Sequence, residues 1–302
     1  MKRKLIKQGT GTMMISLPSK WVKEHNLAKG AEINLEVSND TLVISAREVV
    51  LKSETSIHLT ELTESSIRTS ITNTYRSGFD KVKIYFTDEK QFAVLNEVVK
   101  TRLLGFEIVK KSKDYCLVEN ITEPSLDQFD TIVHKIFFNI SELLEITKRR
   151  MNRESEFDNF WEVEERIQKY DNFCRRVISK RKFSHKHPEF LWSFLSLINH
   201  GQREIYLLNK ILDGKVSISL KTKDFLGEAI QFFTILKEAY LESDLVRLTK
   251  LHSQEKILIY KKAYNLLQHQ KGLDNVFVYH IAASIRRFYQ ANSPLSGLLM
   301  SK

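Results

Sequence analysis

The chain has 302 residues, a net charge of +10 and a pI of about 9.4, which allows two or three domains and indicates an anionic partner such as nucleic acid. The two cysteines, Cys116 and Cys174, lie far apart without a Cys-x-x-Cys pair, which argues against a disulfide framework. No apolar run matches a signal peptide or a membrane span. We therefore expect a soluble, cytoplasmic protein without membrane insertion.

Residues 1–46 predict a small β domain. The order is strand, a Gly-Thr-Gly-Thr turn at residues 9–12, strand, a short helix, and a second hairpin that turns at Asn39-Asp40. So short a segment does not bury a core of its own, and it offers neither a metal site nor a disulfide. We therefore expect a partner chain to complete this domain, with Trp21 and Val22 in its core.

Positive charge gathers at the start of this domain, because six basic residues precede the first acid, Glu24. Small residues in the first turn let a backbone approach phosphates closely. The alternative is a solvated basic tail on a small β domain. The predicted DNA contacts are Lys2, Arg3, Lys4, Lys7, Thr10, Thr12, Lys20 and Lys23.

The segment resembles the AbrB/SpoVT/MazE swapped-hairpin DNA-binding domain. The resemblance rests on three stretches in the family's order, which are residues 4–11 (KLIKQGTG), 17–22 (LPSKWV) and 27–33 (LAKGAEI). It implies that two chains exchange hairpins to form a homodimer. It also implies that this homodimer binds double-stranded DNA through the basic residues of the first strand and the short helix.

Residues 47–123 predict a small α/β domain of order βαβαββ. Gly78 is the expected C-terminal cap of the first helix, and Asp88 the expected N-terminal cap of the second. No residue here indicates a specific chemistry, so we expect a spacer or a module that supports a dimer. The expected elements are strands at 49–52 and 81–86, helices at 60–77 and from 88 to before Gly105, and a hairpin of 106–110 with 115–119.

Residues 124–302 predict six helices. Ser125 and Gln128 form a candidate capping box for the first, Phe157 lies in the second, and the third spans about 187–212. A break at residues 213–215 separates these three helices from three more, the last of which is expected to end at Pro294. Together with the first two domains this gives a multidomain α+β chain whose C-terminal part is a duplicated three-helix bundle.

This helical half resembles the PhoU family, and the whole order resembles archaeal PhoU-like regulators that carry an AbrB-type domain in front. The matching stretches are residues 170–176 (YDNFCRR), 197–201 (LINHG) and 284–288 (SIRRF). The resemblance implies a role in the control of phosphate uptake. It also implies a phosphate transporter or a signalling protein as a further partner.

PhoU proteins often bind metal through a Glu/Asp-x-x-x-Asp motif, whose oxygens share one helix face. Here Ile167 stands four residues before Asp171, Asn199 stands where the third helix would carry Asp, and Ile259 follows Glu255. We therefore expect no metal and no cofactor. Instead, Glu164 and Asp171 are expected to pair with Arg or Lys, because a buried carboxylate needs a partner.

A basic run lies between the second and third helices, at residues 175–187. It holds Arg175, Arg176, Lys180, Arg181, Lys182 and Lys186, with His185 and His187 at its end. So much positive charge repels a cation, which argues against a metal site at the two histidines. We expect a solvated loop, with a second anionic contact as the alternative.

No catalytic signature appears in the chain: there is no Walker A loop, no His-Glu-x-x-His and no Gly-x-Ser-x-Gly. We therefore expect a dimeric DNA-binding transcriptional regulator and not an enzyme. The alternative is an adaptor that binds a phosphate transporter or signalling kinase and uses the N-terminal hairpins only to dimerise. A third interpretation is an antitoxin-like protein whose partner is another protein.

Overall fold

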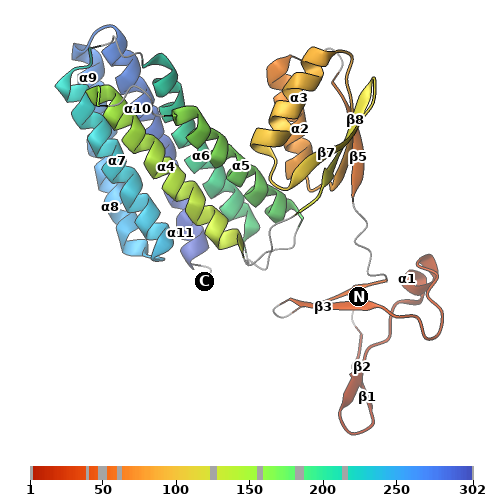
Figure 1. The fold of residues 1–302 in the computed structure, drawn as a ribbon. Coiled ribbons are helices and arrows are strands. Elements are labelled where there is room, and N and C mark those ends of the chain that lie inside the picture. The colour runs from red at the N-terminus through yellow and green to blue at the C-terminus, as the bar shows by residue number, and fades with distance from the viewer. Residues whose placement is uncertain are drawn as a thin grey trace. The chain divides into compact units, whose positions relative to one another are not determined.

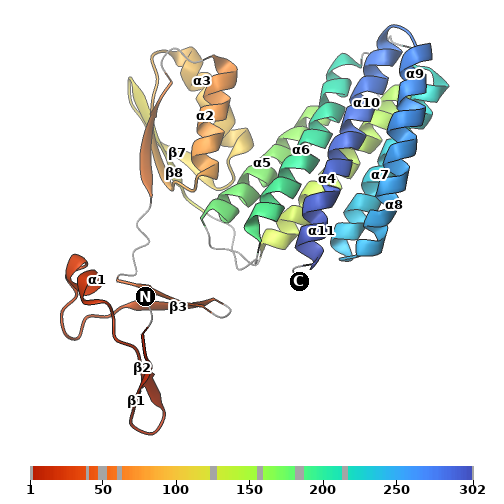
Figure 2. The same ribbon diagram turned by 180° about the vertical axis from the view of Figure 1, so that it is seen from behind.

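The computed structural model describes residues 3–38, 41–46, 53–59, 63–122, 128–154, 159–180, 187–212 and 217–300. The chain divides into two compact units, Met1–Leu51 and Lys52–Lys302. Figures 1 and 2 show the ribbon from opposite sides. The secondary structure is mixed α+β, with the long helices in the C-terminal part.

The N-terminal unit consists of two separate hairpins and one short helix. β1 (Ile6–Gln8) pairs with β2 (Thr12–Met14), and β3 (Asn34–Ser38) pairs with β4 (Thr41–Ser45), both antiparallel. α1 (Ser19–Glu24) lies between the hairpins and begins after Pro18, whose fixed φ suits a helix start. The predicted order of elements is confirmed, while the predicted turn residues Asn39 and Asp40 lie outside the described residues.

The second unit begins with a four-stranded sheet of order β5-β6-β8-β7. Its strands are β5 (Glu54–His58), β6 (Lys81–Tyr85), β7 (Phe106–Lys111) and β8 (Tyr115–Asn120). β5 runs parallel to β6, the other pairs are antiparallel, and β7 carries a bulge between Ile108 and Lys110. α2 (Glu64–Arg76) and α3 (Glu89–Arg102) cover one face of this sheet (Figure 1).

The two predicted caps of these helices are confirmed. Gly78 follows α2 with φ of +92°, a conformation that glycine adopts without strain. The side chain of Asp88 accepts a hydrogen bond from the backbone N–H of Gln91 at 2.8 Å.

One prediction for this region was wrong in position, and a second lies outside the described residues. α2 begins at Glu64 and not at residue 60, because Thr63 caps it by accepting from the N–H of Ser66. The strand expected at residues 49–52 lies outside the described residues. The observed strand β5 follows at 54–58, where charged and polar residues alternate with Thr55 and Ile57 and hide the strand pattern.

Long helices form the rest of the second unit. α4 (Phe129–Asn152), α5 (Phe160–Ser179) and α6 (Pro188–Ile211) are followed by α7 (Leu220–Leu241) and α8 (Leu245–Glu255). α8 continues through the π-helical segment η2 (Lys256–Ala263) into α9 (Tyr264–His269), and α10 (Leu273–Gln290) and α11 (Asn292–Met300) complete the chain. α6 lies along α10 and α4 against α7, so both predicted halves contribute to one continuous apolar core.

Three details of the helical half differ from the sequence-based expectation. The helix after residue 124 begins at Phe129, so Gln128 is its N-cap and makes no side-chain cap bond; Ser125 lies outside the described residues. The expected fifth helix contains eight π-helical residues that periodicity did not reveal. Pro294 lies in the first turn of α11, where proline is tolerated, so it does not end the helical region.

The α/β part and the helices belong to one compact unit because α5 packs against both α2 and α3. α2 and α3 therefore lie between the sheet and α5, as both ribbon views show (Figures 1 and 2). Each part has its own apolar core, one between the sheet and helices α2 and α3, and one among the helices from α4 onward. None of the described helices is both long and apolar enough to cross a membrane.

Candidate nucleic-acid interface

The first hairpin displays most of the predicted DNA-contacting residues. Arg3 and Lys4 precede β1, Lys7 lies within it, Thr10 lies in the turn and Thr12 begins β2; all five are exposed. Gly9 has a φ of +68°, which gives the turn the left-handed residue that it requires. The basic and hydroxyl side chains of the hairpin are therefore exposed to solvent. The remaining predicted contact of this segment, Lys2, lies outside the described residues.

The short helix α1 adds two further cations. Lys20 and Lys23 are exposed, and Lys20 lies 3.9 Å from Glu24 in an exposed i,i+4 pair. Such pairs are worth a few tenths of a kcal/mol, so this one leaves Lys20 available for a phosphate. Every candidate contact that is described is thus accessible to a polyanion.

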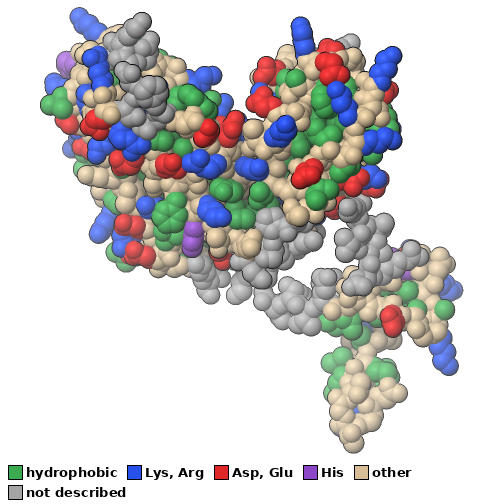
Figure 3. All heavy atoms as spheres, viewed as in Figure 1, with side chains coloured by type: hydrophobic (Ala, Val, Ile, Leu, Met, Phe, Trp, Pro, Cys, Tyr) green, Lys and Arg blue, Asp and Glu red, His purple; other side chains and the backbone are tan. Residues whose placement is uncertain are grey.

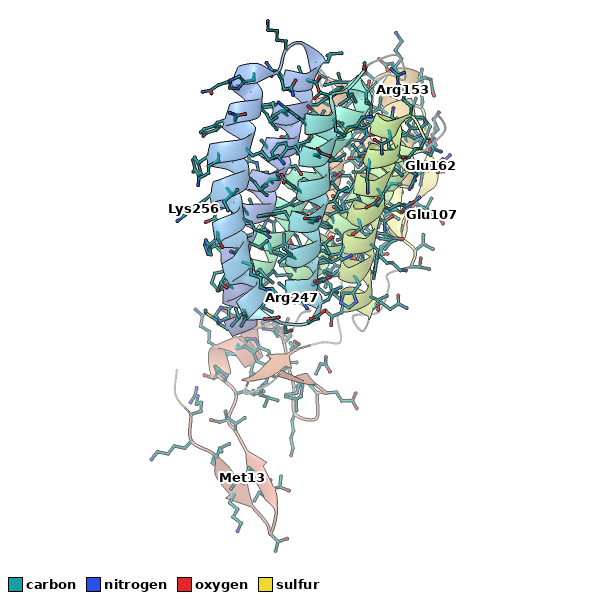
Figure 4. All side chains as sticks on the ribbon, turned by 90° about the vertical axis from the view of Figure 1, so that its left-hand side faces the viewer. Met13, Glu107, Arg153, Glu162, Arg247 and Lys256 are labelled. Carbon is teal, nitrogen blue, oxygen red and sulfur yellow. The ribbon has the colours of Figure 1, made fainter. Side chains whose placement is uncertain are left out.

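The apolar side chains of the N-terminal unit lie largely at its surface (Figure 3). Leu5, Ile6 and Met13, the last of which is labelled in Figure 4, are 67%, 53% and 61% exposed. Trp21 and Val22, expected in the core, are only half-buried within one chain, and Trp21 packs against His25 with ring centroids 4.9 Å apart. Contiguous exposed apolar side chains mark protein or membrane interaction sites, ligand-binding grooves or aggregation-prone surfaces.

The carboxylates that the sequence singled out lie on α5, where that helix meets α2. Asp171 is 1% exposed and receives two hydrogen bonds from Arg175, at 2.8 and 3.0 Å. Asn199 on α6 donates to it at 2.8 Å, and Arg76 on α2 approaches it to 3.4 Å. Burial lowers the pKa of Arg76, while the charge of Asp171 opposes that shift. Asp171 is therefore fully engaged with cations and an amide.

Glu164, two turns earlier on α5, has the same kind of environment. It is 1% exposed and pairs with Arg102 of α3 at 3.0 Å and Arg203 of α6 at 2.7 Å. The prediction that Glu164 and Asp171 pair with Arg or Lys is therefore confirmed. Among the described residues, no group of three His, Cys, Asp or Glu side chains is arranged to hold a metal ion.

The prediction that the basic run is a solvated loop was wrong for its first half. Arg175 and Arg176 belong to α5 and are buried, and Lys180 caps its end. Arg176 and Lys180 both bind Asp80 of the α/β part, Arg176 at 2.5 Å. Residues 181–186 lie outside the described residues, and His187 hydrogen-bonds Glu189 at 3.0 Å.

These ion pairs cross between the α/β part and the helices in both directions. Arginines of α2 and α3 reach carboxylates of α5, while cations of α5 reach Asp80 before β6. Sequence reasoning found the carboxylates but missed Arg76, Arg102 and Asp80, because the partners lie between 62 and 100 residues away along the chain. The only local signal was the placement of Arg76 and Arg102 in the last turns of their helices.

Comparison of the chain with models of known protein families gives no match. Neither the curated proteins nor the solved structures provide a match.

Proposed function

We propose that the protein is a DNA-binding transcriptional regulator that acts as a homodimer, with a PhoU-like helical part as its sensor or interaction domain. The observation that carries this proposal is the stretch from residue 2 to residue 23, which holds six basic residues and no acid. Dimerisation alone needs no such charge, whereas binding to duplex phosphates does. We propose that it controls phosphate uptake, because its helical part resembles the PhoU family.

Dimerisation is supported by the exposed apolar residues of the N-terminal unit. Leu5, Ile6, Met13 and Leu35 are each more than half exposed in one chain, although they stand in or beside strands. Burying such side chains stabilises an interface by about 25 cal/mol per Å² of apolar surface. A second chain that exchanges hairpins would cover them and would also place two basic hairpins in one DNA-binding surface.

A protein-binding adaptor without DNA binding is the second candidate, and one surface favours it. A cavity of about 390 Å³ between η2, α9 and α10 is lined by Tyr264, Tyr279 and Arg286, and the guanidinium of Arg286 lies 5.7 Å from the ring of Tyr260. Tyrosine and arginine are enriched at protein interfaces. Such an adaptor would bind a phosphate transporter or a signalling kinase here.

Duplex binding by the full chain distinguishes these candidates. The variant Arg3→Ala/Lys4→Ala/Lys7→Ala removes three exposed cations from the N-terminal unit. A matched control removes three exposed lysines of the helices, Lys221, Lys250 and Lys256, the last labelled in Figure 4. If the protein is a DNA-binding regulator, only the first variant should lose affinity for duplex DNA. Equal affinity of wild type and both variants would refute it and leave the adaptor.

A further inference from the structure

The face of the sheet that α2 and α3 leave uncovered carries its side chains in three cross-strand rows. Strand register places His58, Tyr85 and Tyr115 directly opposite one another on β5, β6 and β8. The next row holds Ser56, Lys83, Leu117 and Lys110, and the third holds Glu54, Lys81, Glu119 and Glu107. We call the first two rows the aromatic end of this face and the third its acidic end.

The rings of the first row lie in sequence across the three strands. His58 and Tyr85 are stacked, with centroids 4.4 Å apart and planes inclined by 5°, and Tyr115 follows at 6.0 Å from Tyr85 with its plane tilted by 52°. His58 is exposed on the edge strand β5, so the ring face that it turns away from Tyr85 points off the edge of the sheet. A planar group that binds there would extend the stack.

Two ammonium groups lie among these rings. The Nζ of Lys83 is 4.7 Å from the centroid of Tyr85 and 4.2 Å from that of Tyr115, and the Nζ of Lys110 is 5.8 Å from Tyr115. Hydrogen bonds from Ser112 and Lys110, with the charges of Lys110 and Lys83, hold the pKa of Tyr115 below its ordinary value. The aromatic end therefore favours negative charge.

Charge separates the two ends of the face. At the acidic end Lys81 lies 3.1 Å from Glu54 and 3.9 Å from Glu119, so its charge is balanced. Glu107, labelled in Figure 4, adds another carboxylate there. Within the described residues, Lys83 and Lys110 have no carboxylate within ion-pair distance. Two copies with their aromatic ends face to face would bring like charges together, so that arrangement of copies is disfavoured.

We propose that the aromatic end of this sheet face binds single-stranded nucleic acid. Unpaired bases expose flat faces that stack on aromatic rings, and their backbone supplies phosphates to the two lysines. A duplex hides those base faces in its own stack, so this site differs from the duplex-binding surface proposed for the N-terminal unit. It does not depend on that function.

The experiment uses the full chain that carries Arg3→Ala/Lys4→Ala/Lys7→Ala, so that the N-terminal unit contributes little. Its affinity for a labelled oligothymidylate of about 12 nucleotides is measured at low salt. Adding Tyr115→Ala or His58→Ala should weaken binding by about 5- to 150-fold, because each stacked base contributes about 1–3 kcal/mol. Tyr115→Phe restores the ring and should recover most of the affinity that Tyr115→Ala loses.

Lysine substitutions provide the matched control. Lys83→Ala should weaken binding and reduce the salt dependence by about 0.7 per lost phosphate contact, whereas Lys81→Ala, at the acidic end of the same face, should leave binding unchanged. Thermal unfolding of each variant shows whether it is folded. The proposal is overturned if the parent does not bind the oligonucleotide, or if folded Tyr115→Ala binds as tightly as its parent. A change of oligomeric state in Tyr115→Ala would overturn it too, because the face would then be an interface between copies.

These outcomes are independent of the duplex-binding proposal. Loss of duplex binding in the Arg3→Ala/Lys4→Ala/Lys7→Ala variant, with unchanged oligothymidylate binding in Tyr115→Ala, would support the N-terminal surface and refute this site. The reverse pattern would support this site and refute the N-terminal surface.

Discussion

Arg176 offers the sharpest test of how the α/β part is held to the helices. Its side chain is 0% exposed and donates to the carbonyls of Tyr75 and Phe79, at 3.1 and 2.7 Å, and to the carboxylate of Asp80 at 2.5 Å. Its guanidinium also lies about 5 Å from the rings of Tyr75 and Phe106. Arg176→Met keeps an unbranched side chain but removes the charge and these hydrogen bonds.

The expected loss of unfolding free energy depends on which contacts remain after the substitution. Removing one partner of a buried ion pair costs about 3–5 kcal/mol, because the other charge stays buried. Lys180 still binds Asp80, and the carbonyl of Tyr75 still accepts from the N–H of Gly78 at 3.0 Å. The loss should therefore lie at the lower end, at about 3 kcal/mol of unfolding free energy. For a unit of this size that corresponds to a decrease in Tm of about 6–12 °C.

Urea unfolding followed by circular dichroism measures this loss, with thermal unfolding as a second readout. Arg68→Met is the matched control, because Arg68 pairs with Glu64 and Glu97 at the surface of α2. Exposed pairs contribute about 0–1 kcal/mol, so this variant should lose less than about 1 kcal/mol. Equal stability of the two variants would contradict the account in which buried ion pairs hold the two parts together.

Three further predictions follow from the same contacts and burial. Burial raises the pKa of Asp80, but Lys180 and Arg176 outweigh this effect and leave that pKa below its usual value. The stabilisation that the ionised Asp80 gives the folded state is therefore present above about pH 4 and is lost as the pH falls through the lowered pKa. The unfolding free energy, measured as a function of acidic pH, should fall more steeply for wild type than for Asp80→Asn. Burial raises the pKa of Cys116 to about 12 and raises that of Cys174 well above its usual value. Both thiols should therefore react with a disulfide reagent only as fast as the protein unfolds, and rapid reaction of the native protein would contradict their burial. Residues 52–302 form a compact unit and should sediment as a monomer while the full chain sediments as a dimer; a dimer of residues 52–302 would place the interface elsewhere.

Local signals predicted the elements well where periodicity and caps agreed. The alternation in residues 81–86 predicted β6, and Asp88 and Gly78 marked helix ends that the structure confirms. Prediction failed where a local pattern has two readings. Pro294 reads as a helix end but lies in the first turn of α11, and the π-helical segment has no distinctive residue pattern.

The sites depend on contacts between segments distant in sequence, and this limited their prediction. Burial of Asp171 and Glu164 could be anticipated because a helix face placed them among apolar residues, and the need for a cationic partner follows from burial alone. The identity of those partners could not, since Arg76 and Arg102 come from other helices. Likewise, His58, Tyr85 and Tyr115 become a row only through strand register, which the sequence of one strand does not contain.

The salt dependence of duplex binding tests the central claim most directly. The dissociation constant of the full chain is measured between about 50 and about 200 mM salt, for wild type and for Arg3→Ala/Lys4→Ala/Lys7→Ala. Each phosphate neutralised contributes about −0.9 to the slope of log affinity against log salt, so three lost contacts should flatten it by about 2.7 per chain. Lower affinity with that flatter slope is the predicted result. The same affinity and the same slope in both proteins would contradict DNA binding by the N-terminal unit.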